Sequence, residues 1–183
     1  SDPVRVEPNT VAESRQMAAE ARARVFVIFL DTYHTQFDGA VNIRTPLVKF
    51  LDRVLGPDDM VAIMTSDMSA RGLTFGRKTT VIANMVQNDL HWATRGDAQS
   101  DRKEALYNSC YPPVVRAGRP DDTAAEMKRR RREKLTLDSV ADLVSVLGTL
   151  REERKAVVMI SAYKSCAAFI KARLCWVGNS TLP

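Results

Sequence analysis

The hydrophobic positions of this chain gather in three short, uninterrupted runs. They are residues 25–30 (VFVIFL), 60–65 (MVAIMT) and 156–160 (AVVMI). A continuous short apolar run, without alternation, is typical of a strand buried on both faces in the middle of a parallel sheet. We therefore predict that the three runs lie side by side and point in the same direction. Asp31 directly follows the first run, and Ser161 follows the third.

Helical spacing of apolar residues separates the first two runs. Pro46 suits the first turn of a helix. After it, one apolar stripe recurs at helical intervals, at Leu47, Phe50, Leu51, Val54 and Leu55. Gly56 and Pro57 then end the helix. Strand, helix and strand in this order form a right-handed crossover unit, which predicts a parallel sheet covered by helices.

Weaker sequence patterns predict the remaining helices and strands. The predicted strands are a short edge strand at 73–75 and a last strand at 175–177. The predicted helices are a helix-prone stretch at 11–24, a helix capped by Thr79, a short helix near 102–108, a helix from 121–123 to 132, another at 140–147 and one at 167–174. The polar composition and the breaker Tyr111-Pro112-Pro113 indicate an excursion from the fold at about 91–120.

Length and composition favour one folded domain. The 183 residues, 45% of them hydrophobic, suffice for a core without disulfide or metal staples. We expect residues 1–24 to form a partly helical extension and residues 25–183 to form the domain. Its predicted fold class is a three-layer α/β/α, doubly wound fold with a mainly parallel sheet. No apolar run reaches 18 residues, so we expect no membrane insertion by this domain.

The charge excess is small and concentrated. There are 27 Lys and Arg residues against 22 Asp and Glu, and much of the resulting +5 lies in the run 128–132. We interpret this run as a solvated helix end and expect no nucleic acid partner, because no aromatic residues that could stack on bases interrupt it. Salt-sensitive phosphate binding by the same run is the alternative. The cysteines Cys110, Cys166 and Cys175 form no CxxC pair, and whether any of them pair is left open.

Candidate chemistry lies after the predicted strands. Ligands of open parallel sheets bind beyond the carboxyl ends of the strands, which directs attention to residues 31–35, 65–67 and 161–164. A carboxylate placed directly after a buried strand, as Asp31 is, binds a cation or a cluster of amides, or else caps the following turn. The sequence contains no GxSxG, HExxH, P-loop or GxGxxG motif, so the common hydrolase and nucleotide-binding signatures are missing.

The order of these segments resembles a known family. The stretch VFVIFLDTYHT at 25–35, the amphipathic helix and then DDMVAIMT at 58–65 look like the opening of a von Willebrand factor type A domain. The segment 129–161 fits the same pattern, so the likeness covers roughly residues 20–165. The chain is similar to the bacterial "VWFA-related" proteins that are abundant in acidobacteria. The resemblance implies a secreted or periplasmic, envelope-associated parent protein.

The resemblance also implies a metal-ion-dependent adhesion site. Carried over by position, its metal ligands would be Asp31, Thr35 and Thr136, the last just before a helix, with Mg²⁺ or another divalent cation bound. Tyr33 stands where the family has its first Ser, and Ala162 near the expected second Asp. A tyrosine hydroxyl lies too far out to coordinate from a serine position, and a methyl group cannot ligate. We therefore expect a degenerate site. Of a bound divalent cation and no cofactor at all, we expect the second.

The functional prediction is a non-enzymatic, adhesion-type domain that binds an unidentified protein partner. The residues expected to contact that partner are Tyr33, His34, Ser161 and Tyr163. Two alternatives come from other classes of protein. One is a metal-assisted α/β hydrolase or phosphotransfer enzyme that uses Asp31 and His34. The other is a basic nucleic-acid-binding module that acts through residues 128–132.

Overall fold

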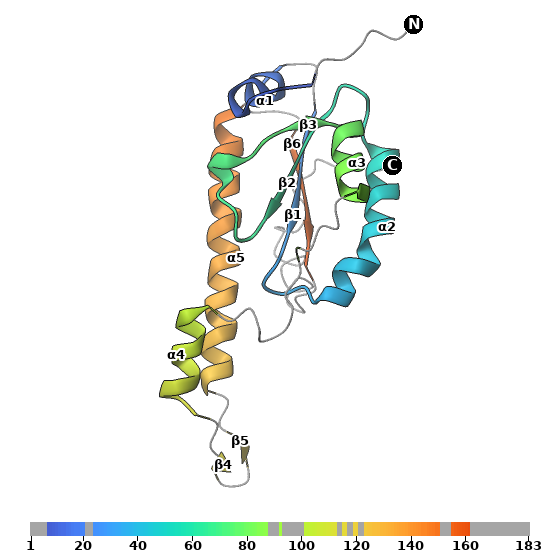
Figure 1. Ribbon diagram of the computed structural model, residues 1–183. Helices are drawn as coiled ribbons and strands as arrows, with labels where there is room; N and C mark the ends of the chain where they lie inside the picture. Colours follow the sequence, from blue (N-terminus) through green and yellow to red (C-terminus); the bar gives the residue numbers. More distant parts are fainter. Residues whose placement is uncertain are drawn as a thin grey trace, which may run out of the picture.

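A computed structural model gives the fold of the chain. It describes residues 7–20, 24–87, 92, 101–112, 115–116, 119–120, 123–150 and 155–161. The chain has a mixed α/β fold built on a four-stranded, mostly parallel sheet (Figure 1). In spatial order β3-β2-β1-β6, its strands are Gly76–Arg77, Met60–Thr65, Val25–Leu30 and Lys155–Ile160. The three apolar runs are therefore the three long strands, as predicted.

Parallel pairing is also confirmed. β1 pairs in parallel with β2, Val25 opposite Met60, and with β6, Val25 opposite Lys155. Every residue of β1 is buried, because β1 lies between two neighbours and has helices on both of its faces. The three strands therefore end at the same edge of the sheet, hereafter the carboxyl edge.

The antiparallel edge strand lies later in the chain than predicted. β3 pairs with β2 at residues 76–77 and not at 73–75. Leu73 and Phe75 are fully buried instead, in the connection that follows the 3₁₀ turn η1 (Ala70–Gly72). The apolar–polar–apolar pattern of residues 73–75 is the same as that of a strand, because a loop that packs on the core can also bury every second side chain.

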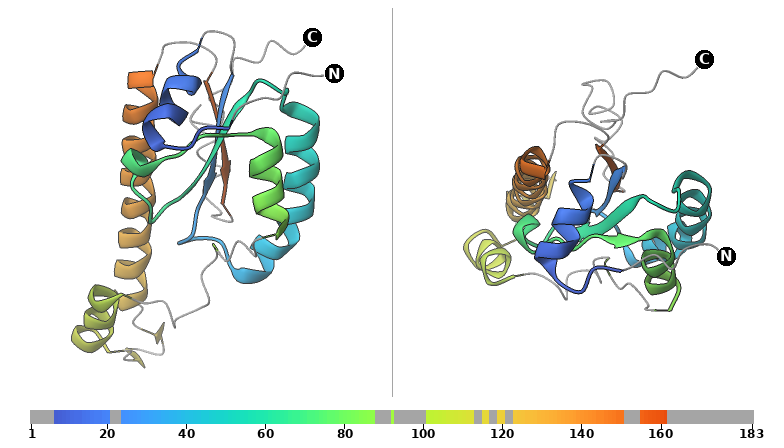
Figure 2. Two further views of the ribbon diagram at one scale, coloured as in Figure 1. Left: turned by 45° about the horizontal axis from the view of Figure 1, so that its top comes forward. Right: turned by 90° about the horizontal axis from the view of Figure 1, so that it is seen from above.

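Helices lie on both faces of the sheet (Figures 1 and 2). On one face, α1 (Val11–Ala18) and α5 (Thr123–Leu150) pack against the odd-numbered side chains of β1, such as Val27 and Phe29. On the other face, α2 (Phe37–Val54) and α3 (Lys78–Gln87) cover Phe26, Ile28 and Leu30. Alternate side chains of one strand thus supply both cores, which explains why its apolar run is continuous.

Two predicted helix starts are wrong. α2 begins at Phe37, so Pro46 lies inside the helix and not in its first turn. Pro46 is exposed there, which places its ring toward solvent. α3 begins at Lys78 and includes Thr79, which was expected to be its cap. Helix α1 begins at Val11 as predicted but ends at Ala18, well before residue 24, and Thr10 accepts a hydrogen bond from the Glu13 N–H as its N-cap.

The largest correction concerns α5, which was predicted as two helices and is one. It runs through residues 123–150 without interruption. Residues 133–139 contain no glycine or proline, and strong helix formers flank the β-branched Thr136, so nothing in the local sequence stops the helix. Its carboxyl half packs on the sheet through Leu143 and Leu147. Its amino half extends past the sheet and lies beside α4 (Arg102–Cys110), the short helix predicted within the excursion (Figure 1).

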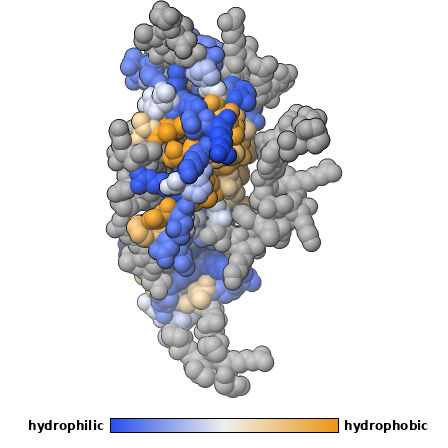
Figure 3. Space-filling model, turned by 90° about the vertical axis from the view of Figure 1, so that its right-hand side faces the viewer, coloured by the Kyte–Doolittle hydropathy of each residue, from blue (hydrophilic) through white to orange (hydrophobic). Residues whose placement is uncertain are grey.

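After α4, the excursion contains a small hairpin. Its strands β4 (Val115–Arg116) and β5 (Arg119–Pro120) pair antiparallel. The helix predicted at 167–174, the strand predicted at 175–177 and Tyr163 lie outside the described residues. Within the described ranges, no helix is both long and apolar enough to cross a bilayer. The face shown in Figure 3 carries apolar side chains among hydrophilic ones, and the exposed apolar residues of α2 are Phe37, Val41 and Phe50.

Candidate functional site at the carboxyl edge

Backbone hydrogen bonds hold the three strand ends together. The Asp31 N–H donates to the Ile160 carbonyl (2.9 Å), and the Ser66 N–H donates to the Leu30 carbonyl (3.1 Å). Each bond extends the parallel ladder one residue beyond the strands. The first residues after β1, β2 and β6 are therefore neighbours, which places Asp31 between Ser66 and Ser161.

The carboxylate of Asp31 is fully buried and accepts hydrogen bonds from four donors. Its Oδ1 accepts from the Tyr33 N–H (3.2 Å) and from Thr136 Oγ1 (3.1 Å). Its Oδ2 accepts from Ser161 Oγ (2.7 Å) and lies 2.8 Å from His34 Nδ1. A buried carboxylate needs such partners, because leaving it unpaired costs several kcal/mol.

These contacts set the protonation state of Asp31. Burial alone would raise its pKa, but the hydrogen bonds from His34, Ser161 and Thr136 together outweigh burial and lower the pKa below its ordinary value of 3.8. The group is therefore an anion at neutral pH. Its charge is satisfied by the chain's own donors.

The structure brings two of the three candidate metal ligands into direct contact. Thr136 bonds to Asp31, although it lies in the middle of α5 and not just before a helix as predicted. A buried threonine inside a long helix can reach the carboxyl edge because α5 passes across it. Thr35 is also buried, and its N–H donates to the Asp31 carbonyl (3.2 Å).

Ser66 is a site residue that the sequence analysis did not single out. Its Oγ accepts from the Thr32 N–H (3.0 Å) and lies 2.6 Å from Thr32 Oγ1. This pair joins the loop after β1 to the loop after β2. The available signal was its position, because Ser66 is the first residue after the second apolar run.

A pocket of about 390 Å³ opens beside this cluster. The loop after β1 supplies two of its walls, Tyr33 and His34, and α4 supplies Asn108. The other lining residues come from α5: Ala125, Lys128, Arg129 and Arg132. Two features that the sequence analysis kept apart, the candidate partner-binding loop and the basic run, therefore line one pocket.

The basic run lies inside α5 and not at a helix end as predicted, and its arginines are ion-paired although Arg129 and Arg130 stay exposed to solvent. Arg131 pairs with Asp101, and Arg132 forms a bidentate pair with the buried Glu104 (2.6 and 2.8 Å). The other two arginines pair on α5 itself: Arg129 and Arg130 share Glu126, and Arg129 also approaches Glu133. The pairs to α4 fasten that helix to α5.

Tyr33 lies among these charges. Burial raises the pKa of its phenol above 10.0, and the negative charges of Asp67, Asp101 and Glu104 add to the rise, while Arg131 opposes it. The phenol is therefore neutral at physiological pH and can donate a hydrogen bond into the pocket. Of the other predicted contact residues, Ser161 is engaged with Asp31, and Tyr163 lies outside the described residues together with Ala162.

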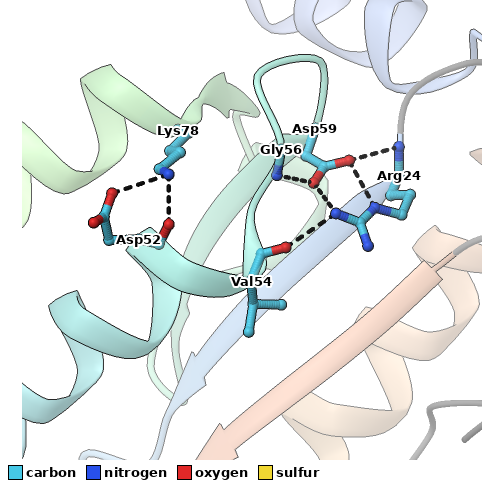
Figure 4. A network of polar contacts seen from close by, with 6 residues as sticks. All are labelled: Arg24, Asp52, Val54, Gly56, Asp59 and Lys78. Atoms are coloured by element: carbon cyan, nitrogen blue, oxygen red, sulfur yellow. Dashed lines mark hydrogen bonds and ion pairs between the residues drawn. The ribbon is translucent and has the colours of Figure 1, made fainter.

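A second buried carboxylate, Asp59, lies at the opposite, amino end of the strands (Figure 4). It accepts from the backbone N–H (3.3 Å), Nε (2.9 Å) and Nη2 (2.6 Å) of Arg24, and from the Gly56 N–H (2.6 Å). Arg24 also donates to the Val54 carbonyl (3.0 Å). Nearby, Lys78 joins α3 to Asp52 of α2 (Figure 4).

Comparison of the chain with protein-family models, curated proteins and solved structures gives no match. The class that the structure itself defines is a mixed α/β protein with a four-stranded, mostly parallel sheet. At its carboxyl edge, a hydrogen-bonded carboxylate lies next to a basic pocket.

Proposed function

We propose that this chain is a non-enzymatic protein-interaction domain that binds its partner at the carboxyl edge. The observation that carries the proposal is the pocket there, bounded by Tyr33 and His34 and built next to an Asp31 whose oxygens are already engaged. In this proposal the fold is the three-layer von Willebrand type A arrangement. The sheet order, with β1 central and helices on both of its faces, supports it. In this proposal the parent protein is also a bacterial protein that is secreted or located in the periplasm or cell envelope, as the resemblance implies.

In this proposal, binding does not use a metal. The implied ligands Asp31, Thr35 and Thr136 supply one carboxylate, and that carboxylate already accepts from four donors of its own chain. A divalent cation prefers six or more oxygen ligands and gains most from several carboxylates. Among the described residues, no cluster of three or more His, Cys, Asp or Glu side chains exists that could hold such an ion. The donor set therefore fits a divalent cation poorly.

The proposal also excludes nucleic acid as the partner. Affinity for a phosphate backbone comes from cations that exchange their counterions for phosphates. Arg131 and Arg132, the less exposed arginines of the basic run, are paired with Asp101 and Glu104 of α4, so binding a phosphate would break the pairs that fasten α4 to α5.

A peptide-display selection against the purified chain, in buffer with EDTA, tests the proposal. Amide chemical-shift mapping of an enriched peptide should move the signals of residues 31–35 and 66–68 and leave those of Arg24 and Gly56 in place. If no peptide is enriched, or if the chemical-shift changes are confined to the amino end of the strands, the proposed function is wrong.

One observation favours a second candidate function. Asp31 lies 2.8 Å from His34 Nδ1, the contact by which a carboxylate orients a catalytic imidazole. Under this alternative, the chain is a metal-assisted hydrolase or phosphotransfer enzyme. Turnover of simple phosphate or carboxylic esters that His34→Ala abolishes would establish it. The interaction proposal predicts no turnover above background.

A further inference from the structure

The pocket at the carboxyl edge carries a more specific inference, which rests on the proposed function. We infer that it binds a single carboxylate side chain of the protein partner, with the Lys128 ammonium as the principal cation.

The first step is the charge balance of the basic run. The four arginines 129–132 are matched by four carboxylates: Glu126, Glu133, Asp101 and Glu104. Lys128 adds a fifth positive charge. Within the part of the chain that the structure describes, Lys128 makes no hydrogen bond or ion pair, and it lines the pocket. Counted over the described residues, the α5 side of the pocket therefore carries a surplus of one positive charge.

The second step is the chemistry of the remaining walls. Tyr33 has a neutral phenol and Asn108 an amide, so both can donate hydrogen bonds to an anion. His34 is held in place by its contact with Asp31. Ala125 contributes a small apolar surface that suits the methylene groups of a side chain. Donors on two sides and one cation match the two oxygens and the single charge of a carboxylate.

The third step separates a carboxylate from a phosphate. A phosphate ester at neutral pH carries up to two negative charges, and sites for it usually present two or more cations or arginine forks. Here Arg129 and Arg132 direct their forks to Glu126 and Glu104. One surplus charge balances a carboxylate and leaves a dianion unbalanced. Asp67, whose charge reaches Tyr33, further disfavours a dianion.

NMR titration of the whole chain with two blocked tripeptides, acetyl-Gly-Glu-Gly-amide and acetyl-Gly-Gln-Gly-amide, tests this inference. We expect the glutamate peptide to shift the Lys128 side-chain and Tyr33 signals and to bind at least five times more tightly than the glutamine peptide. Lys128→Met should abolish this preference, because the cation is removed while the aliphatic stem stays. Lys49→Met, which removes an exposed lysine of α2, is the control and should change the affinity less than twofold.

A second variant tests whether a negative charge near Tyr33 weakens the binding of a carboxylate. Asp67→Asn removes a negative charge near Tyr33 and should tighten glutamate-peptide binding about twofold, an effect that rising salt should reduce. Melting curves confirm that each variant is folded.

Equal binding of the two tripeptides, or no effect of Lys128→Met, would overturn the inference. So would tighter, Lys128-dependent binding of inorganic phosphate or of duplex DNA, each titrated separately. If these results appear while selected peptides still map to residues 31–35, the proposed function stands and only the carboxylate assignment fails. If selected peptides map elsewhere but the glutamate preference holds, the pocket is an anion site and the proposed function fails.

Discussion

A buried carboxylate lies at each end of the sheet, and the two are held in different ways. Asp59, at the amino end, is matched by the full positive charge of Arg24, which also lies over the Phe26 ring (5.2 Å). Asp31, at the carboxyl end, is held by two hydroxyls, one backbone N–H and one imidazole.

This difference separates a structural junction from a candidate site. The Arg24–Asp59 pair joins the starts of β1 and β2 to the end of α2 (Figure 4). The hydrogen-bond donors around Asp59 bond within this junction. The Asp31 cluster joins β1, β6 and α5 and, in addition, holds His34 at the wall of a pocket. A buried carboxylate therefore indicates function only where its partners also face a cavity.

The largest expected effect is that of Asp31→Ala. The substitution leaves several polar groups buried without their acceptor, Thr136 and Ser161 among them, and should lower the free energy of unfolding by about 3–5 kcal/mol. Urea unfolding at pH 7 measures the loss. A loss below about 1 kcal/mol would mean that the carboxylate does not organise this edge.

Asp59→Ala should cost less, about 2–3 kcal/mol by the same measurement. Its main partner Arg24 is 46% exposed in its side chain, so the guanidinium can turn to water when the carboxylate is removed. The donors around Asp31 have less access to solvent. A larger loss for Asp59→Ala than for Asp31→Ala would reverse the comparison between the two ends.

Acid should weaken the carboxyl end through Asp31. Because its pKa in the folded chain is below that of the unfolded chain, its ionised form stabilises the fold above about pH 4. This stability is lost as the pH falls through the folded-state pKa. Unfolding free energies measured from pH 6 to pH 3 should therefore fall more steeply for the native chain than for Asp31→Asn. Parallel curves would contradict the depressed pKa.

The smallest expected effect on stability is that of Thr136→Val, about 1 kcal/mol. The substitution keeps the shape of the side chain and removes one of the hydrogen bonds to Asp31. Thr149→Val in the same helix is the control, because its exposed hydroxyl bonds to the carbonyl of Val146, three residues earlier in the same helix. Equal effects of the two variants would show that the Thr136 contact adds nothing to the cluster.

The sequence predicted the parallel core because its signal is local. Continuous apolar runs at 25–30, 60–65 and 156–160 follow from burial on both faces, and the position of Asp31 at a strand end follows from them. Thr136 was predicted to lie near Asp31, which it does, but it was expected just before a helix and lies inside α5. Two weak helix signals predicted two helices where the chain forms one.

The pocket could not be predicted in the same way. The partners of Arg131 and Arg132, Asp101 and Glu104, lie about thirty residues earlier in the chain, on a helix whose place beside α5 no local pattern specifies. Without these pairs the basic run looks like free positive charge. With them, Lys128 is the residue of the run that makes no hydrogen bond or ion pair within the described part of the chain.

The effect of magnesium on the melting temperature tests the central claim, recognition at the carboxyl edge without a metal, most directly. A cation present at about 100 times its dissociation constant would stabilise the fold by about 2.7 kcal/mol, which for a chain of this size corresponds to a rise of about 5–10 °C. We predict that replacing EDTA with excess Mg²⁺ changes the melting temperature by less than about 1 °C. A rise of several degrees that Asp31→Ala abolishes would contradict the account and make Asp31 a metal ligand.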